Sequence, residues 1–83
     1  MAAFQAYARF VSVDPSKNRF RYYCLTWQPA LWGGGTLCRS WGRIGTKGRS
    51  ILAHYEDRSS AQEAIGEAIR RRLQHGYQVV DAC

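Results

Sequence analysis

The sequence predicts an α+β fold, in which a four- to five-stranded antiparallel sheet carries one amphipathic helix across one face. Segments rich in β-branched and aromatic residues, separated by turn residues, occupy the first two thirds of the chain. The last third changes to a helical period of apolar residues. A chain of 83 residues holds one modest core, so we expect a single domain over residues 1–83.

The strands are predicted from composition and from the turns between them. They cover residues 4–13, 19–27, 36–45 and 49–56. Residues 14–18, Asp-Pro-Ser-Lys-Asn, are typical of a turn, so the first two strands should pair as a hairpin. Residues 28–35 contain Pro29 and three glycines, which indicates a loop. The spacing of Gly45 and Gly48 suits a tight turn before the fourth strand.

The helix is predicted over residues 60–75. Apolar residues repeat there at helical spacing and should face the sheet: Ala61, Ala64, Ile65, Ala68, Ile69 and Leu73. Ser60 and Glu63 have the spacing of a capping box, in which each side chain satisfies a free backbone donor of the first turn. Gly76 suits the end of the helix, and residues 77–80 are a candidate fifth strand.

Charge is unevenly distributed along the chain. Twelve Lys and Arg oppose six Asp and Glu, for a net charge of +6, and residues 15–55 contain seven basic residues and no acid. A field of one sign over half of a small domain attracts polyanions. The alternative is that the charge only aids solubility. We favour a polyanion partner because the basic stretch also carries turn residues and an aromatic.

The three cysteines indicate neither a disulfide framework nor a zinc site. Cys24, Cys38 and Cys83 are odd in number and contain no Cys-x-x-Cys pair, so idle thiols in a reducing, cytoplasmic compartment are expected. The N-terminus has no signal pattern. No apolar run approaches the roughly 18 residues that a membrane span needs.

Catalytic motifs are absent from the sequence. The glycine-rich segment that ends in threonine lacks the lysine of a phosphate-binding loop, and no nucleophile has an identifiable base. Glu63 and Glu67 are expected on the exposed face of the helix. The sequence therefore predicts no catalytic residue, no bound metal, no cofactor and no small-molecule substrate, which argues against an enzyme.

The segment Arg39–Gly48, RSWGRIGTKG, resembles the signature of the WGR domain family, which is named for Trp-Gly-Arg. The segment Lys17–Tyr23, KNRFRYY, is similar to the start of the family's second strand. The helix start and the closing His-Gly-Tyr also fit, so the resemblance extends from about Phe4 to Val80. Two features depart from the family pattern: the long loop 28–35 and the displaced basic cluster Arg70–Arg72.

The resemblance implies a binding module. WGR domains of DNA-dependent poly(ADP-ribose) polymerases contact DNA near strand ends and relay that contact to a catalytic domain, and others are small free-standing bacterial proteins. The implied function is a non-catalytic module of the free-standing type that contacts the DNA backbone or DNA ends. The alternative is a protein-interaction module that docks an acidic protein partner. The sequence leaves DNA against RNA open.

Strand alternation gives the candidate site its geometry. Arg39, Trp41 and Arg43 should share one face, where an indole stacks on a sugar or an unpaired base while arginines hold phosphates. The alternative is that Trp41 belongs to the core beneath the helix. The predicted nucleic-acid-binding residues are Asn18, Arg19, Arg39, Trp41, Gly42, Arg43, Lys47 and Arg49.

Overall fold

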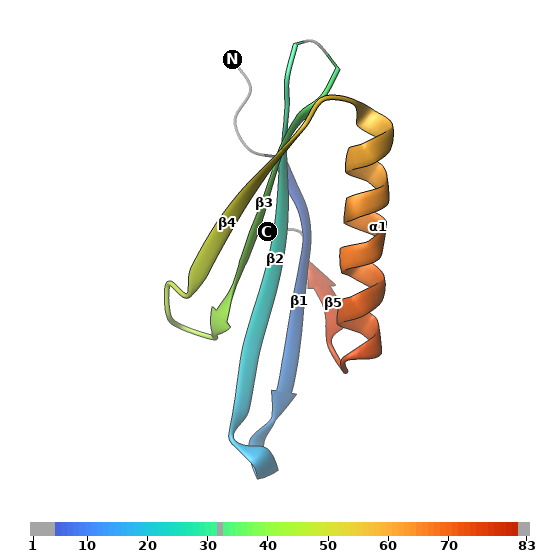
Figure 1. The fold of residues 1–83 in the computed structure, drawn as a ribbon. Helices are drawn as coiled ribbons and strands as arrows, with labels where there is room; N and C mark the ends of the chain where they lie inside the picture. The colour runs from blue at the N-terminus through green and yellow to red at the C-terminus, as the bar shows by residue number, and fades with distance from the viewer. Residues whose placement is uncertain (1–4, 32, 82–83) are drawn as a thin grey trace.

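The computed structural model of the protein describes residues 5–31 and 33–81. Five strands form one antiparallel sheet in the order β4-β3-β2-β1-β5, and a single helix packs against one of its faces (Figure 1). The bounds are β1 Gln5–Asp14, β2 Arg19–Pro29, β3 Gly35–Arg43, β4 Arg49–Tyr55, α1 Arg58–Gln74 and β5 Gln78–Asp81. The predicted α+β fold is confirmed.

The β1–β2 hairpin turns through a 3-10 helix over Pro15–Lys17. The Asp14 carboxylate accepts a hydrogen bond from the backbone N–H of Ser16 at 3.2 Å, and Asn18 closes the turn in the left-handed region at φ 52°. Asparagine tolerates that conformation better than most residues do. The hairpin extends past the C-terminal end of α1, so its tip is not covered by the helix (Figure 1).

The connection between β2 and β3 is shorter than the predicted loop over 28–35. β2 continues to Pro29, which pairs with Gly35 at the start of β3. A proline is tolerated there because the end of a strand does not require its missing N–H donor. The predicted start of the loop at residue 28 is therefore too early, and the sheet gains length at this end.

The helix begins at Arg58, before the predicted start. Its N-cap is Asp57, whose Oδ1 accepts the backbone N–H of Ser60 at 2.8 Å. The predicted capping box of Ser60 and Glu63 is wrong, because Ser60 already lies within the first turn. Gly76 follows the helix at φ 84°, as the sequence predicts.

The core lies between α1 and the central strands. Its buried residues are Ala8, Phe10, Tyr23, Leu25, Leu37, Ile65 and Tyr77. Most of the predicted helical stripe packs on this cluster, but Leu73 is exposed. Three turns after the buried Ala61, the sheet-facing position belongs to Arg72 instead, because eleven residues complete about three turns.

The cysteines differ from one another. Cys24 is disulfide-bonded, so the prediction of an idle thiol is wrong there, whereas Cys38 carries a free, half-buried thiol. Cys83 lies outside the described residues. Within the described ranges, no helix is long and apolar enough to cross a membrane. No group of three or more His, Cys, Asp or Glu side chains in these ranges could hold a metal ion.

Candidate nucleic-acid interface

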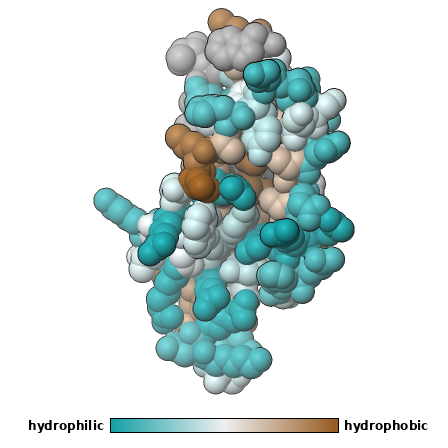
Figure 2. Space-filling model, in the orientation of Figure 1, coloured by the Kyte–Doolittle hydropathy of each residue, from teal (hydrophilic) through white to brown (hydrophobic). Residues whose placement is uncertain are grey.

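An open groove with a volume of about 600 Å³ lies at the uncovered end of the sheet. The tip of the β1–β2 hairpin, the end of β3 and the C-terminal end of α1 form its walls. Among the predicted site residues, it is lined by Asn18, Arg19, Trp41, Gly42 and Arg43. The remaining lining residues are Lys17, Phe20, Arg21, Arg72 and Tyr77. Five of the lining residues are basic and none is acidic. Hydrophilic residues dominate the surface in this part of the molecule (Figure 2).

Arg43 connects the end of β3 to the hairpin. Its Nη2 donates a hydrogen bond to Asn18 Oδ1 at 3.4 Å, and its Cζ lies 5.2 Å from the centre of the Phe20 ring. The backbone N–H of Ile44 also donates to the Phe20 carbonyl at 2.9 Å. These contacts hold one wall of the groove in place, and they leave the remaining Arg43 donors available to a ligand.

Arg72 reaches the groove from the last turn of α1. Its Cζ lies 4.6 Å from the ring centre of Tyr23 and 5.4 Å from that of Tyr77. Arg19 approaches Tyr77 as well, at 6.0 Å. Guanidinium groups are attracted to aromatic faces, so the rings fix both arginines in position.

Three arginines carry a buried Nε without a hydrogen-bond partner in the described part of the chain. They are Arg19, Arg39 and Arg72. A buried donor without a partner is unfavourable, and functional sites are one of the places where such groups occur. An oxyanion or a water molecule would supply the missing acceptor.

Trp41 lies at the border between the groove and a smaller pocket of about 270 Å³. Arg39 lines that second pocket together with Trp41 and Arg72. The indole is 37% exposed, lies outside the core cluster and stacks on Tyr23 with a ring-centre distance of 6.4 Å. Trp41 is therefore not the core residue that the alternative interpretation supposed.

The β3–β4 turn folds away from the groove. The Tyr22 hydroxyl donates to the Lys47 carbonyl at 2.7 Å, and Tyr22 points to the sheet face opposite its neighbour Tyr23. A Cβ on Gly42 would lie 2.7 Å from the Cα of Gly48, so this approach requires glycine. Lys47 and Arg49 line neither of the two pockets, although Arg49 pairs with Trp41 in the sheet register.

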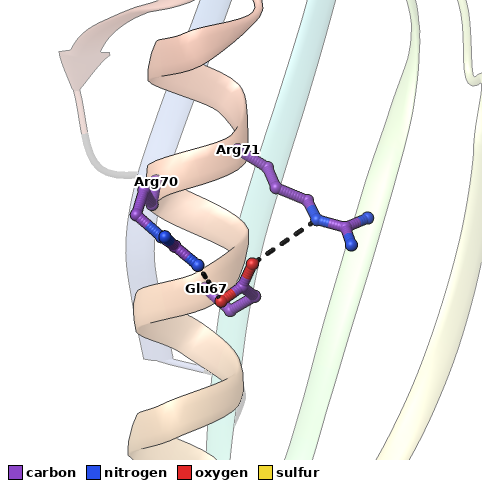
Figure 3. A network of polar contacts seen from close by, with 3 residues as sticks. All are labelled: Glu67, Arg70 and Arg71. Carbon is purple, nitrogen blue, oxygen red and sulfur yellow. Dashed lines mark hydrogen bonds and ion pairs between the residues drawn. The ribbon is translucent and has the colours of Figure 1, made fainter.

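Glu67 accounts for the ion pairs recorded in the described part of the chain. It pairs with Arg70, and its Oε2 lies 3.6 Å from Nε of Arg71 (Figure 3). The hydrogen bond from Arg70, with the charges of Arg70 and Arg71, lowers the pKa of Glu67. Within the described residues, no arginine of the groove has a carboxylate partner, so the positive charge there is uncompensated.

Five residues that line the groove were not among the predicted site residues: Lys17, Phe20, Arg21, Arg72 and Tyr77. Arg21 lies two residues from Arg19 on the same strand, so the period of two already placed it on the same face. Arg72 falls on the helical period that starts at Ala61, but the predicted sheet-facing stripe counted apolar residues only. Tyr77 had no signal beyond the closing His-Gly-Tyr.

Comparison with known proteins shows the family of the chain. Uncharacterized protein y4dW of Sinorhizobium fredii is 38% identical over 74 residues, which cover 88% of this chain and 36% of that protein. This chain therefore spans only 36% of the length of that relative. No solved structure matches the chain. The family model of the WGR domain, a type of nucleic-acid-binding module in poly(ADP-ribose)-polymerase-like proteins, matches residues 6–82, and the chain therefore belongs to the WGR domain family.

Proposed function

We propose that the protein binds DNA through the sugar–phosphate backbone, with the groove at the end of α1 as its contact surface. The observation that carries this proposal is the gathering of basic residues from four elements around one groove without an acid: Lys17, Arg19, Arg21, Arg43 and Arg72. Charge of one sign in a concave site raises the local concentration of a polyanion. Contacts to phosphate position a protein on DNA without reading its sequence.

The groove combines two kinds of contact. The arginines present planar, bidentate donors that match phosphate oxygens. The exposed face of Trp41 offers a surface for a sugar or an unpaired base, which favours DNA ends, nicks and single strands over an uninterrupted duplex. The WGR modules of DNA-dependent poly(ADP-ribose) polymerases, which belong to the same domain family, support DNA over RNA.

A titration by fluorescence anisotropy with blunt, nicked and single-stranded DNA tests the proposal. Neutralising about four to six phosphates should give a slope of log K against log salt near −4 to −5 on duplex DNA. Absence of binding to every DNA form at low salt, with a folded protein, would falsify the proposal. Binding of poly-glutamate without binding of DNA would instead support the acidic-partner alternative.

The proposed role is not catalytic. We expect the pure protein to transfer no ADP-ribose from NAD and to hydrolyse no substrate, because no nucleophile, base or cofactor loop was found in the sequence. NAD turnover that survives removal of contaminants would contradict this expectation. The cytoplasmic location stays a prediction, and the disulfide at Cys24 argues against a reducing compartment.

A further inference from the structure

The outer side of β4 is an open edge of the sheet, because no strand in the described part of the chain pairs with it. Edge strands expose unpaired N–H and C=O groups, and proteins usually protect them by shortness, charge or proline. β4 has seven residues, and its segment 50–55 contains no Lys, Arg, Asp, Glu or Pro. The opposite edge, β5, has only four residues. β4 is therefore the less protected edge.

β4 also exposes two consecutive aliphatic side chains. Ile51 is 46% exposed and Leu52 is 54% exposed. Because consecutive residues point to opposite faces, apolar surface lies on both sides of this edge. A hydrophobic patch with hydrophilic neighbours occupies the region of β4 (Figure 2). A partner strand would pair the free backbone groups of this edge and cover its apolar side chains.

We propose that β4 pairs in antiparallel fashion with β4 of a second copy of this chain, about a two-fold axis at Leu52. The symmetric register places Leu52 opposite Leu52 and Ile51 opposite Ala53. Arg49 then lies opposite Tyr55, so all seven residues of the strand take part. The two sheets become one continuous sheet, which is a common mode of strand addition, and the contact is isologous.

The charges that flank β4 select a second copy and its direction. Lys47 and Arg49 lie at the start of the strand, and Glu56 and Asp57 follow its end. Antiparallel pairing brings the basic start of each copy to the acidic end of the other. Parallel pairing would place like charges side by side, which is unfavourable. The edge is therefore complementary to itself in one direction only.

The symmetry also fixes where the two grooves lie. The two-fold axis of an antiparallel strand pair is perpendicular to the sheet, so both α1 helices lie on the same side. Both basic grooves then open on one face of the dimer. This last consequence rests on the proposed function, because it makes the dimer a bivalent DNA-binding surface.

Sedimentation equilibrium without DNA tests the dimer. One strand pair buries less than a standard interface of about 1,600 Å², so we expect weak association, and the protein concentration should extend to about 1 mM. We expect a reversible monomer–dimer equilibrium. Leu52→Lys should raise the dissociation constant about tenfold or more, because two ammonium groups then face each other at the axis. Val80→Lys is the matched control, since Val80 is 52% exposed on the other edge strand. It should leave the equilibrium unchanged.

A charge reversal provides an independent test. In this register Lys47 takes the position opposite Asp57 of the second copy, so Lys47→Glu should turn attraction into repulsion and weaken the dimer. Thermal melts followed by circular dichroism check that each variant is folded. A monomer at every concentration overturns the proposal, as does a dimer that survives Leu52→Lys or is lost equally in Val80→Lys. Binding of DNA by a monomer would leave the proposed function intact, whereas a dimer without DNA binding would overturn only that function.

Discussion

The sheet face that α1 packs on has two ends, which the same strands form but which differ in burial. On β3, Leu37 is 1% exposed under α1, whereas Trp41, four residues further along the same face, is 37% exposed at the groove. On β2, the same change separates buried Leu25 from exposed Arg21. The helix covers one end and not the other. The groove is therefore a continuation of the core surface, supported by the same hydrogen-bonded strands.

A stack of aromatic and cationic side chains marks the border between these ends. Trp41 lies on Tyr23, and Tyr23 lies under the guanidinium of Arg72. Tyr23 is itself buried in the core. Such amphipathic groups suit a border because one part packs on apolar surface while another remains in contact with water. Four substitutions test whether residues on the covered side determine stability while residues on the groove side determine binding.

The largest effect on stability is expected at the covered end. Leu37→Ala should lower the free energy of unfolding by about 2–5 kcal/mol, because it removes buried methyl groups and leaves a cavity. Chemical denaturation measures the change. The same substitution at exposed Leu52 is the control, and it should cost about 0.5 kcal/mol or less. Equal losses at the two positions would show that burial under α1 does not decide the cost of the truncation.

Trp41→Ala should act on binding. The free energy of DNA binding should weaken by about 1–3 kcal/mol if the indole stacks on the ligand, while the protein stays folded. Trp27→Ala is the matched control, since Trp27 packs against the core. It should lower the melting temperature instead. A stability loss of about 3–5 kcal/mol in Trp41→Ala, with binding unchanged, would contradict a role of the indole in binding.

Arg43→Ala should weaken binding to all DNA sequences alike and flatten the salt slope by about one unit. Its effect on the free energy of unfolding should stay within about 0.5 kcal/mol. Arg70→Ala changes the net charge equally, but Arg70 pairs with Glu67 and does not line the groove. An equal loss of slope in both variants would mean that net charge alone, and not the groove, governs binding.

The smallest effect is expected at the exposed pairs of Glu67. Its pKa is lower in the folded protein than the usual 4.5, so its contribution to stability is present above that value. The contribution is lost as the pH falls through the lower folded-state pKa. Glu67→Gln should therefore lower the melting temperature slightly at neutral pH and not in strong acid. A difference that is constant across this pH range would exclude the ion pairs as its cause.

The strands and the helix were predictable because each has a local periodicity, but the ends of these elements were not. Asp57 and Ser60 are both good N-cap residues, and the local sequence does not decide between them. The β3-β2-β1-β5 order brings the last strand beside the first, and no local pattern encodes that pairing. β2 was predicted to end before Pro29, because the local sequence does not show that this proline lies at the margin of the sheet, where its missing N–H is tolerated.

The candidate site was predictable where strand alternation decides it. Trp41 and Arg43 share a face by period two, and both line the groove. Lys47 was included because its charge was expected to reach a ligand from the tip of the turn, whereas a hydrogen bond from Tyr22 fixes this turn on the other side of the sheet. Arg72 was missed because the stripe facing the sheet was identified by hydrophobicity alone. Its place over Tyr23 depends on where the helix ends.

Arg72 has a consequence for the entropy of recognition. Its guanidinium already lies against two tyrosine rings, and its Nε is buried. A freely rotating arginine loses about 0.5–1.5 kcal/mol of conformational entropy when a ligand immobilises it. For Arg72 that loss occurs when the chain folds, before any ligand is present. Arg72→Lys would keep the charge, but the more flexible lysine side chain would lose this entropy in the binding step instead.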